Sequence, residues 1–319
     1  MSMELLEHTV VVHLDINIWS GRAKLRREDI PNADNLPPEA LASLGSKKLI
    51  DPALLKAFNT IRARASVMLD RAGVRFIGSW LVHDSKLAEV EQNLLDYRNE
   101  FERAAYEFVS TYETNTESWL NQFPEWASVV RPVLPDVAAM RGKFGFRWQT
   151  FKVMPSLTSS GDGLQESIAG LPETALAEVV AMVKDIYTDT FEGKDTVTKK
   201  AVRPVRTLIA KLDAISYISP VLYSTKQAVE KAAAWLEFNV ADEKVVRQFK
   251  HFLCSLMTVE GIKLTMGQAP TDEEAMQSFV QNVGAQVQEP ELEPEPEPEP
   301  ELMTNEQAMA GMLDSMGLW

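Results

Sequence analysis

The chain has 319 residues, 45% of them hydrophobic and 24% charged, which is ordinary globular composition and enough for one large core or two smaller ones. Its single cysteine, Cys254, cannot form an internal disulfide, which excludes a disulfide-stabilised domain and favours a reducing compartment. No run of about 18 apolar residues occurs and the first residues lack a secretory signal pattern, so we expect a cytoplasmic protein without a transmembrane helix.

The net charge of −14 is unevenly distributed along the chain. Residues 289–319 contain nine acidic residues and no Lys or Arg, so the rest of the chain carries only −5. Acidity is therefore mainly a property of the tail, and it does not argue against a basic surface elsewhere.

Two strands and a helix are predicted in the first part of the chain. Residues 9–19 alternate apolar and polar side chains, which is typical of a half-buried strand. A basic cluster and a Pro-rich loop follow. Apolar residues at helical spacing predict a helix over 52–72 that ends before Gly73, and residues 74–82 predict a second strand.

A long helix is predicted from residue 84 to about 121. Leu87, Leu94, Phe101 and Phe108 recur every seven residues and form an apolar stripe, while charged residues occupy the other faces. A single helix cannot bury such a stripe alone, so it needs a partner helix, which the sequence leaves open as one in cis or in trans.

The remainder of the folded region is predicted to be mainly helical. A third strand is expected over 144–153 and a loop over 155–163, followed by helices at 172–190, 197–216, 221–237 and 242–260. Residues 1–285 therefore predict a mainly α (α+β) fold: a small N-terminal antiparallel sheet, a long coiled-coil-like helical hairpin and C-terminal helices.

The tail changes character at residue 286. Glu and Pro alternate up to residue 301, and we expect residues 286–301 to be a disordered, extended linker, spanning about 40 Å over thirteen residues at about 3.1 Å per residue. Residues 302–319 then predict an amphipathic peptide for docking on a partner protein; docking on the chain's own body and a solubilising tail are the alternatives. Its apolar positions are Met309, Met312, Leu313, Met316, Leu318 and Trp319.

Motifs for catalysis, cofactors and metals are not found. The sequence has no glycine-rich phosphate-binding pattern and no nucleophile elbow, and its four histidines are scattered. We therefore predict a protein that is not an enzyme and that needs no cofactor.

Two basic stretches, residues 141–152 and 194–211, keep nucleic acid as an alternative partner, because cations track phosphates and aromatic rings stack on bases. Core-facing aromatic residues and a solvated helix face are the competing interpretations. The candidate nucleic-acid contacts are Arg141, Lys143, Arg147, Trp148, Lys152, Lys199, Lys200, Arg203 and Arg206.

Several blocks resemble a known bacterial family over about residues 8 to 260. They are the run from Leu14 to Arg22 with Leu25, the run 44–48, Gly73-Val74-Arg75-Phe76, Phe191 with Gly193, Arg203-Pro204 and Lys211-Leu212. The order of these blocks is similar to that of domain-of-unknown-function family 3150, which has no established activity. Members of that family occur in bacteria, phages and integrating elements, often encoded beside a MoxR-type AAA+ ATPase and a von Willebrand factor A-type (VWA) protein.

Two functions follow as hypotheses. The resemblance implies a non-catalytic adaptor of an ATPase-driven system, with the AAA+ ATPase or the VWA protein as partner, docking through the C-terminal peptide. The alternative is a nucleic-acid-associated protein of a phage or mobile element, acting through the basic stretches. Neither hypothesis involves a membrane.

Overall fold

The computed structural model describes residues 2–30, 42–154, 163–270 and 273–286. The chain divides into two units, Met1–Val287 and Gln288–Trp319, and the second lies outside the described residues. The predicted linker and docking peptide therefore stay predictions. Among the described residues, no helix is both long and apolar enough to cross a bilayer.

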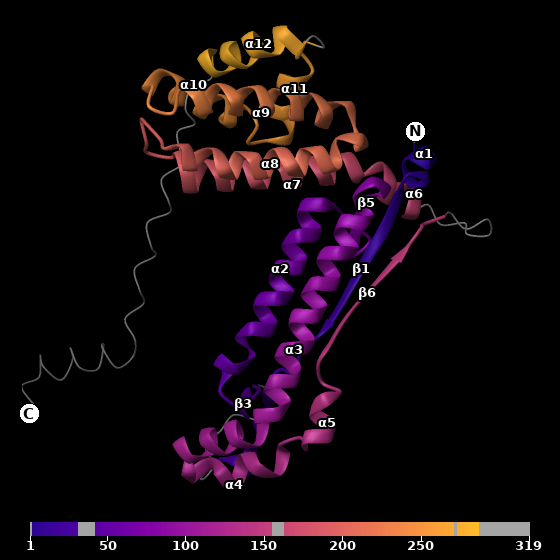
Figure 1. The fold of residues 1–319 in the computed structure, drawn as a ribbon, viewed down its shortest axis with the longest axis vertical. Helices are drawn as coiled ribbons and strands as arrows, with labels where there is room; N and C mark the ends of the chain where they lie inside the picture. Colours follow the sequence, from indigo (N-terminus) through magenta and orange to yellow (C-terminus); the bar gives the residue numbers. More distant parts are fainter. Residues whose placement is uncertain (1, 31–41, 155–162, 271–272, 287–319) are drawn as a thin grey trace, which may run out of the picture. The chain divides into compact units, whose positions relative to one another are not determined.

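The described part of the first unit is mainly helical with a small sheet, which confirms the predicted fold class (Figure 1). The strands are β1 (Thr9–Asn17), β2 (Arg22–Lys24), β3 (Ser46–Lys48), β4 (Gly73–Phe76), β5 (Ser79–His83) and β6 (Gly145–Phe151). The helices are α1 (Ser2–Glu7), α2 (Lys56–Ala72), α3 (Asp84–Gln122), α4 (Ala127–Val130), α5 (Val137–Arg141), α6 (Gly163–Ala169), α7 (Leu171–Ile186), α8 (Val202–Ile215), α9 (Pro220–Phe238), α10 (Glu243–Ser255), α11 (Val259–Met266) and α12 (Glu273–Gln286).

The main sheet is antiparallel, in the order β4-β5-β1-β6, and β2 pairs with β3 in a separate ribbon. The predicted strand 74–82 is a hairpin, β4 and β5, rather than one strand. Its turn places Ile77 at φ +48° and Gly78 at φ +70°. Two consecutive residues with positive φ are typical of a tight hairpin turn. Isoleucine rarely adopts a positive φ, so the sequence did not predict a turn at this position.

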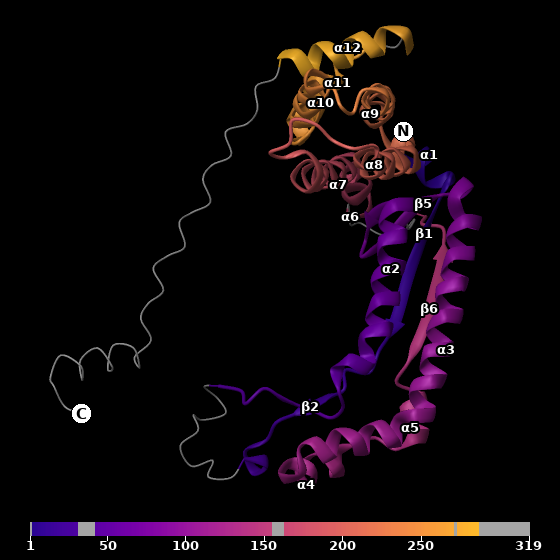
Figure 2. The same ribbon diagram turned by 60° about the vertical axis from the view of Figure 1, so that its left-hand side comes forward.

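Successive residues of the sheet contribute to two different cores. Val11 and Leu81 face one core together with α7 and α8, while Val12 and Val82 face the other core together with α2 and α3. Side chains alternate between the two faces of a strand, so each neighbouring pair divides between the two layers. Figure 2 shows α2 and α3 lying along the sheet.

The apolar stripe of α3 is buried within this chain. Leu94, Phe101 and Phe108 are each at most 5% exposed, and Phe58 of α2 contacts Phe101 and Phe108 through edge-to-face rings with centroids 5.1 and 5.9 Å apart. The long helix therefore has a partner helix in cis. Between the two helices in sequence, the chain forms the β4–β5 hairpin.

The C-terminal helices form their own layer, in which α8 packs on α9 and α12 packs on α9 and α10. Pro204 is the third residue of α8, where its missing N–H leaves no intrahelical bond unmade. The predicted helix 242–260 is two helices, α10 and α11, because the chain turns at Leu256 and restarts with Thr258, whose hydroxyl caps α11 by accepting from Gly261 N.

Candidate functional site: a groove between α2, α3 and α8

A groove of about 820 Å³ lies between α2, α3 and α8, and we call it the α2–α3–α8 groove. The exposed face of α2 supplies most of one wall, because residues 56, 60, 63, 64, 67 and 71 repeat at helical spacing on the face opposite the buried stripe. The start of α3 supplies the other wall, and Ala210 and Ala214 of α8 close one side.

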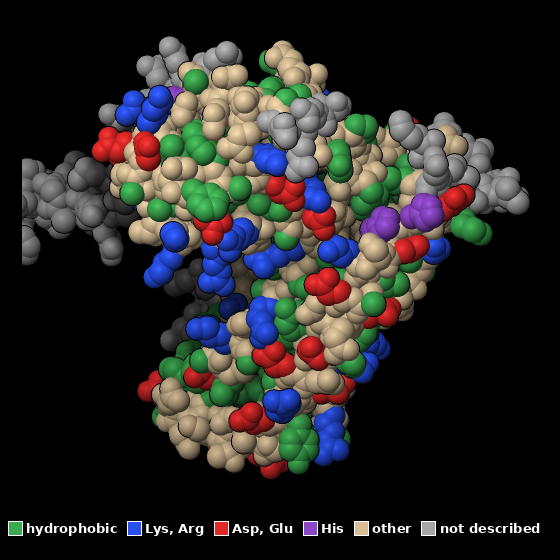
Figure 3. Space-filling model, turned by 45° about the horizontal axis from the view of Figure 1, so that its top comes forward, with side chains coloured by type: hydrophobic (Ala, Val, Ile, Leu, Met, Phe, Trp, Pro, Cys, Tyr) green, Lys and Arg blue, Asp and Glu red, His purple; other side chains and the backbone are tan. Residues whose placement is uncertain are grey.

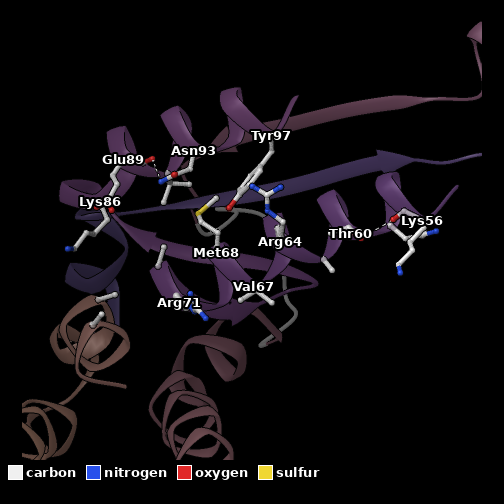
Figure 4. A pocket seen from close by; sticks show the side chains of 16 residues that line it. Lys56, Thr60, Arg64, Val67, Met68, Arg71, Lys86, Glu89, Asn93 and Tyr97 are labelled. Atoms are coloured by element: carbon white, nitrogen blue, oxygen red, sulfur yellow. Dashed lines mark hydrogen bonds between the residues drawn. The ribbon is translucent and has the colours of Figure 1, made fainter. Parts of the chain in front are cut away.

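The inner surface of the groove is mainly apolar. Val67, which is 45% exposed, and Met68 project from α2, while Val90 and Tyr97 come from α3 (Figure 4). Small residues such as Ala63 leave the space open between them. A surface of this kind is suited to apolar side chains of a partner segment.

Four Lys and Arg side chains surround this apolar surface. Lys56 and Lys86 lie at opposite ends of the groove, with Arg64 and Arg71 between them (Figure 4). Glu89 is the one acidic residue among the described residues that line it. Figure 3 shows Lys and Arg side chains gathered around a hollow on one face of the molecule. The groove therefore combines an apolar floor with a mostly cationic rim.

The four cations differ in how they are held. Arg64 bonds both carboxylate oxygens of Glu100, at 2.8 and 2.9 Å, and lies 5.0 Å from the centre of the Tyr97 ring. Lys86 lies 3.4 Å from a carboxylate oxygen of Asp213. Lys56 and Arg71 have no side-chain partner among the described residues, so their charges remain available to an anionic ligand.

A buried lysine fixes α8 against the end of α2 and so holds the third wall in place. Lys211 is 1% exposed, and its Nζ donates to the carbonyl oxygens of Asp70 and Gly73, each at 2.5 Å, and to Glu178 Oε2 of α7 at 2.6 Å. The two carbonyls lie at the C-terminal end of α2, where backbone acceptors lack helical partners. Glu178 Oε1 also accepts from Arg75 N at 2.9 Å, so one carboxylate joins α7, α8 and the start of β4.

Burial lowers the pKa of Lys211, and the Glu178 carboxylate opposes that shift by favouring the charged ammonium. The geometry indicates a structural role: three acceptors surround the ammonium and leave no donor for a substrate.

The first predicted basic stretch contributes mainly to structure. Trp148 is half-buried beneath Arg98, whose guanidinium lies 5.2 Å from the ring centre. Arg147 forms an exposed ion pair with Asp15 at 3.1 Å. Lys152 donates to the Glu7 carbonyl and to Asp84. These three residues therefore do not share one open cationic surface.

The other predicted cations are exposed but dispersed. Arg141 ends α5, and Lys143 follows it before β6. Arg203 and Arg206 project from α8, and Arg206 bonds both oxygens of Glu237 at 2.6 and 2.7 Å. Lys199 and Lys200 occupy the turn before α8. Their contact with nucleic acid stays a prediction.

The groove itself was not predicted from the sequence. Its signal was the exposed stripe of α2, where Lys56, Arg64 and Arg71 alternate with Val67 on the face opposite the core stripe. A metal site has no support in the described part of the chain, where no three His, Cys, Asp or Glu side chains cluster.

The chain belongs to the family described as "Protein of unknown function (DUF3150)", which it matches over residues 6–248. This match confirms the resemblance seen in the sequence blocks. No curated protein and no solved structure matches the chain. The family has no assigned activity.

Proposed function

We propose that this protein is a non-catalytic adaptor that binds a segment of a partner protein in the α2–α3–α8 groove. The observation that supports this proposal is the combination of an apolar floor with a cationic rim. An amphipathic helix binds a groove by burying its apolar face, and acidic residues beside that face would meet Lys56 and Arg71. The partner segment is therefore acidic and amphipathic.

The resemblance to the family supplies the first partners to test. A MoxR-type AAA+ ATPase or a VWA protein encoded in the same bacterial, phage or mobile-element locus is our proposed partner. The C-terminal peptide 302–319 is a second proposed docking element, and it lies outside the described residues. The test must therefore separate the groove from the peptide.

The experiment measures binding of purified ATPase and purified VWA protein to the full chain by biolayer interferometry. Lys56→Glu combined with Arg71→Glu reverses two exposed charges without touching the core. We expect affinity to fall about tenfold or more, since two rim attractions of up to about 1 kcal/mol each become repulsions. The matched control is Lys244→Glu with Arg247→Glu on the exposed face of α10, which should leave affinity unchanged.

A deletion of residues 302–319 completes the design. Loss of binding in the deletion alone would assign docking to the peptide and not to the groove. Equal affinity of the groove variant, the α10 control and the unaltered chain would refute groove docking. Failure of the unaltered chain to bind either protein would refute the proposed partners.

A further inference from the structure

The predicted C-terminal peptide, residues 302–319, has the composition that the α2–α3–α8 groove is suited to bind. Met309, Met312, Leu313 and Met316 follow the spacing i, i+3, i+4 and i+7, at which the apolar anchors of a groove-binding helix recur. Methionine suits such a surface, because its flexible and polarisable side chain adapts to an irregular floor. The chain therefore carries its own candidate ligand for the groove.

The charges of the tail and of the groove are opposite in sign. Residues 289–319 hold nine acidic residues and no Lys or Arg. The described residues that line the groove include four Lys and Arg but one acidic residue, Glu89. Two of the four cations, Lys56 and Arg71, have no side-chain partner among the described residues. An acidic segment with an apolar face thus matches both the rim and the floor.

The groove is long enough for such a peptide. Its wall runs along α2 from Lys56 to Arg71, which is about 22 Å at 1.5 Å per residue, and the exposed Val67 lies between these two cations (Figure 4). In a helix, the apolar positions from Met309 to Met316 would span about 10 Å. Glu306 would lie about one turn before Met309 at the edge of the apolar face, where a cation of the rim can meet it.

The linker is long enough to bring the peptide from the end of α12 to the groove. Gly284 of α12 lies against α10, where its carbonyl oxygen is 2.9 Å from His251 Nδ1. Helix contacts lead from α12 to α9, from α9 to α8 and from α8 to α2. These are three steps of about 8–10 Å each, or about 30 Å in all. Residues 287–301 would span about 46 Å when extended at about 3.1 Å per residue.

We propose that residues 302–319 occupy the α2–α3–α8 groove of their own chain and keep a partner out until a competing segment displaces them. This inference rests on the groove-docking function proposed above and adds its regulation. A ligand on a short flexible tether has an effective concentration of about 1 mM. A peptide that binds with a Kd of about 100 µM would then fill about nine grooves in ten and raise the apparent Kd of the partner about tenfold.

Thiol cross-linking in the full chain tests this occupancy directly. Cys254→Ala removes the native thiol, and Asn305→Cys places a new one beside the apolar positions of the peptide. Ala63→Cys places the second thiol in the groove, at an exposed residue that lines it. The matched control is Ala241→Cys, which is also exposed and precedes α10, the helix on which α12 packs. With a short bismaleimide, the groove pair should cross-link within one chain about fivefold or more faster than the control pair.

Charge and apolar variants identify the contacts that hold the peptide. Lys56→Glu with Arg71→Glu should slow the groove cross-link to the rate of the control pair. Met312→Asp with Leu313→Asp should do the same, and these changes lie outside the described core. Lys244→Glu with Arg247→Glu, on the exposed face of α10, should leave the rate unchanged. Circular dichroism checks that each variant is folded.

Three results would overturn the proposal. One is an equal cross-linking rate for the groove pair and the control pair. Another is a groove cross-link that both the charge variant and the apolar variant leave unchanged, since proximity alone would then explain it. The third is a cross-link that forms only between two chains, which gel mobility reveals and which would make a second copy the source of the peptide.

Partner binding separates this inference from the proposed function. Deletion of residues 302–319 should raise the affinity of a partner that docks in the groove about tenfold. Groove cross-linking in a chain that binds neither the ATPase nor the VWA protein would refute the proposed partners and leave self-docking supported. Groove-dependent partner binding that the deletion leaves unchanged would refute self-docking and leave the adaptor function supported.

Discussion

Glu178→Ala removes the counter-charge of Lys211, the most deeply buried cation among the described residues. Glu178 is 23% exposed and Lys211 is 1% exposed, at a distance of 2.6 Å. Breaking a buried pair by removing one partner costs about 3–5 kcal/mol, because the remaining charge stays buried. The partial exposure of Glu178 puts the expected loss in the free energy of unfolding at about 3 kcal/mol. Urea unfolding followed by circular dichroism at pH 7 measures it.

The matched control is Glu237→Ala, which removes the partner of another α8 cation. Arg206 and Glu237 are 64% and 39% exposed, so this pair should contribute less than about 1 kcal/mol. If the two alanine variants lose equal stability, the reasoning about burial is wrong. The double variant Glu178→Ala with Lys211→Met should lose less than the sum of the two single losses, with a coupling of about 1–3 kcal/mol.

The same pair predicts a dependence on pH. Burial lowers the pKa of Lys211 in the folded state below its pKa in the unfolded chain. At pH values between these two pKa values the unfolded state binds more protons than the folded state, so the free energy of unfolding rises with pH there. Loss of Glu178 lowers the pKa further, because the carboxylate favours the charged form. The destabilisation by Glu178→Ala should therefore be smaller at pH 9.5 than at pH 7. A penalty that is constant across this range would contradict the assignment.

Two further predictions concern single sites. Tyr217→Phe should stabilise the protein by about 1 kcal/mol in thermal unfolding, because the buried Tyr217 hydroxyl has no hydrogen-bond partner among the described residues. Burial also raises the pKa of Tyr217, so above about pH 10 this tyrosine ionises only in the unfolded state. The free energy of unfolding should therefore fall by up to about 1.4 kcal/mol per pH unit above about pH 10. The Tyr217→Phe variant should not show this contribution to the fall. Gly73→Ala should lower the free energy of unfolding by more than about 2 kcal/mol in urea, because the added Cβ would come within 2.2 Å of the Leu81 carbonyl oxygen. Unchanged stability of the Gly73→Ala variant would show that the hairpin moves aside freely.

The long-range pattern of the chain predicted its main elements well. The seven-residue recurrence in 84–121 corresponds to α3, and the alternation in 9–19 corresponds to β1. Each element buries one face, so its apolar residues recur in the sequence with the period of that element. Boundaries that depend on one residue's backbone were missed. Ile77 adopts a positive φ against its preference, and Leu256 interrupts an apolar run without a glycine or proline.

Sites made from separate segments could not be predicted in the same way. The α2–α3–α8 groove depends on Ala210 and Ala214, which lie beside α2 although they are more than a hundred residues away from it in the sequence. In the sequence, Lys211 cannot be distinguished from the other cations of the basic stretch 194–211. Only the fold shows that Lys211 is buried while Arg203 and Arg206 of the same helix are exposed. Periodicity reports which face of an element is covered, but it does not report what covers it.

Two aromatic-rich regions show why residue type alone does not locate a binding surface. In residues 141–152, Phe144 stacks on Phe58 at 4.5 Å and Phe146 is 5% exposed, so these rings stabilise the core. At the distal end of α3, Phe123 and Trp126 follow the last turn of the helix, where no described element covers them fully. Aromatic side chains thus pack in the core in one region and are exposed in the other.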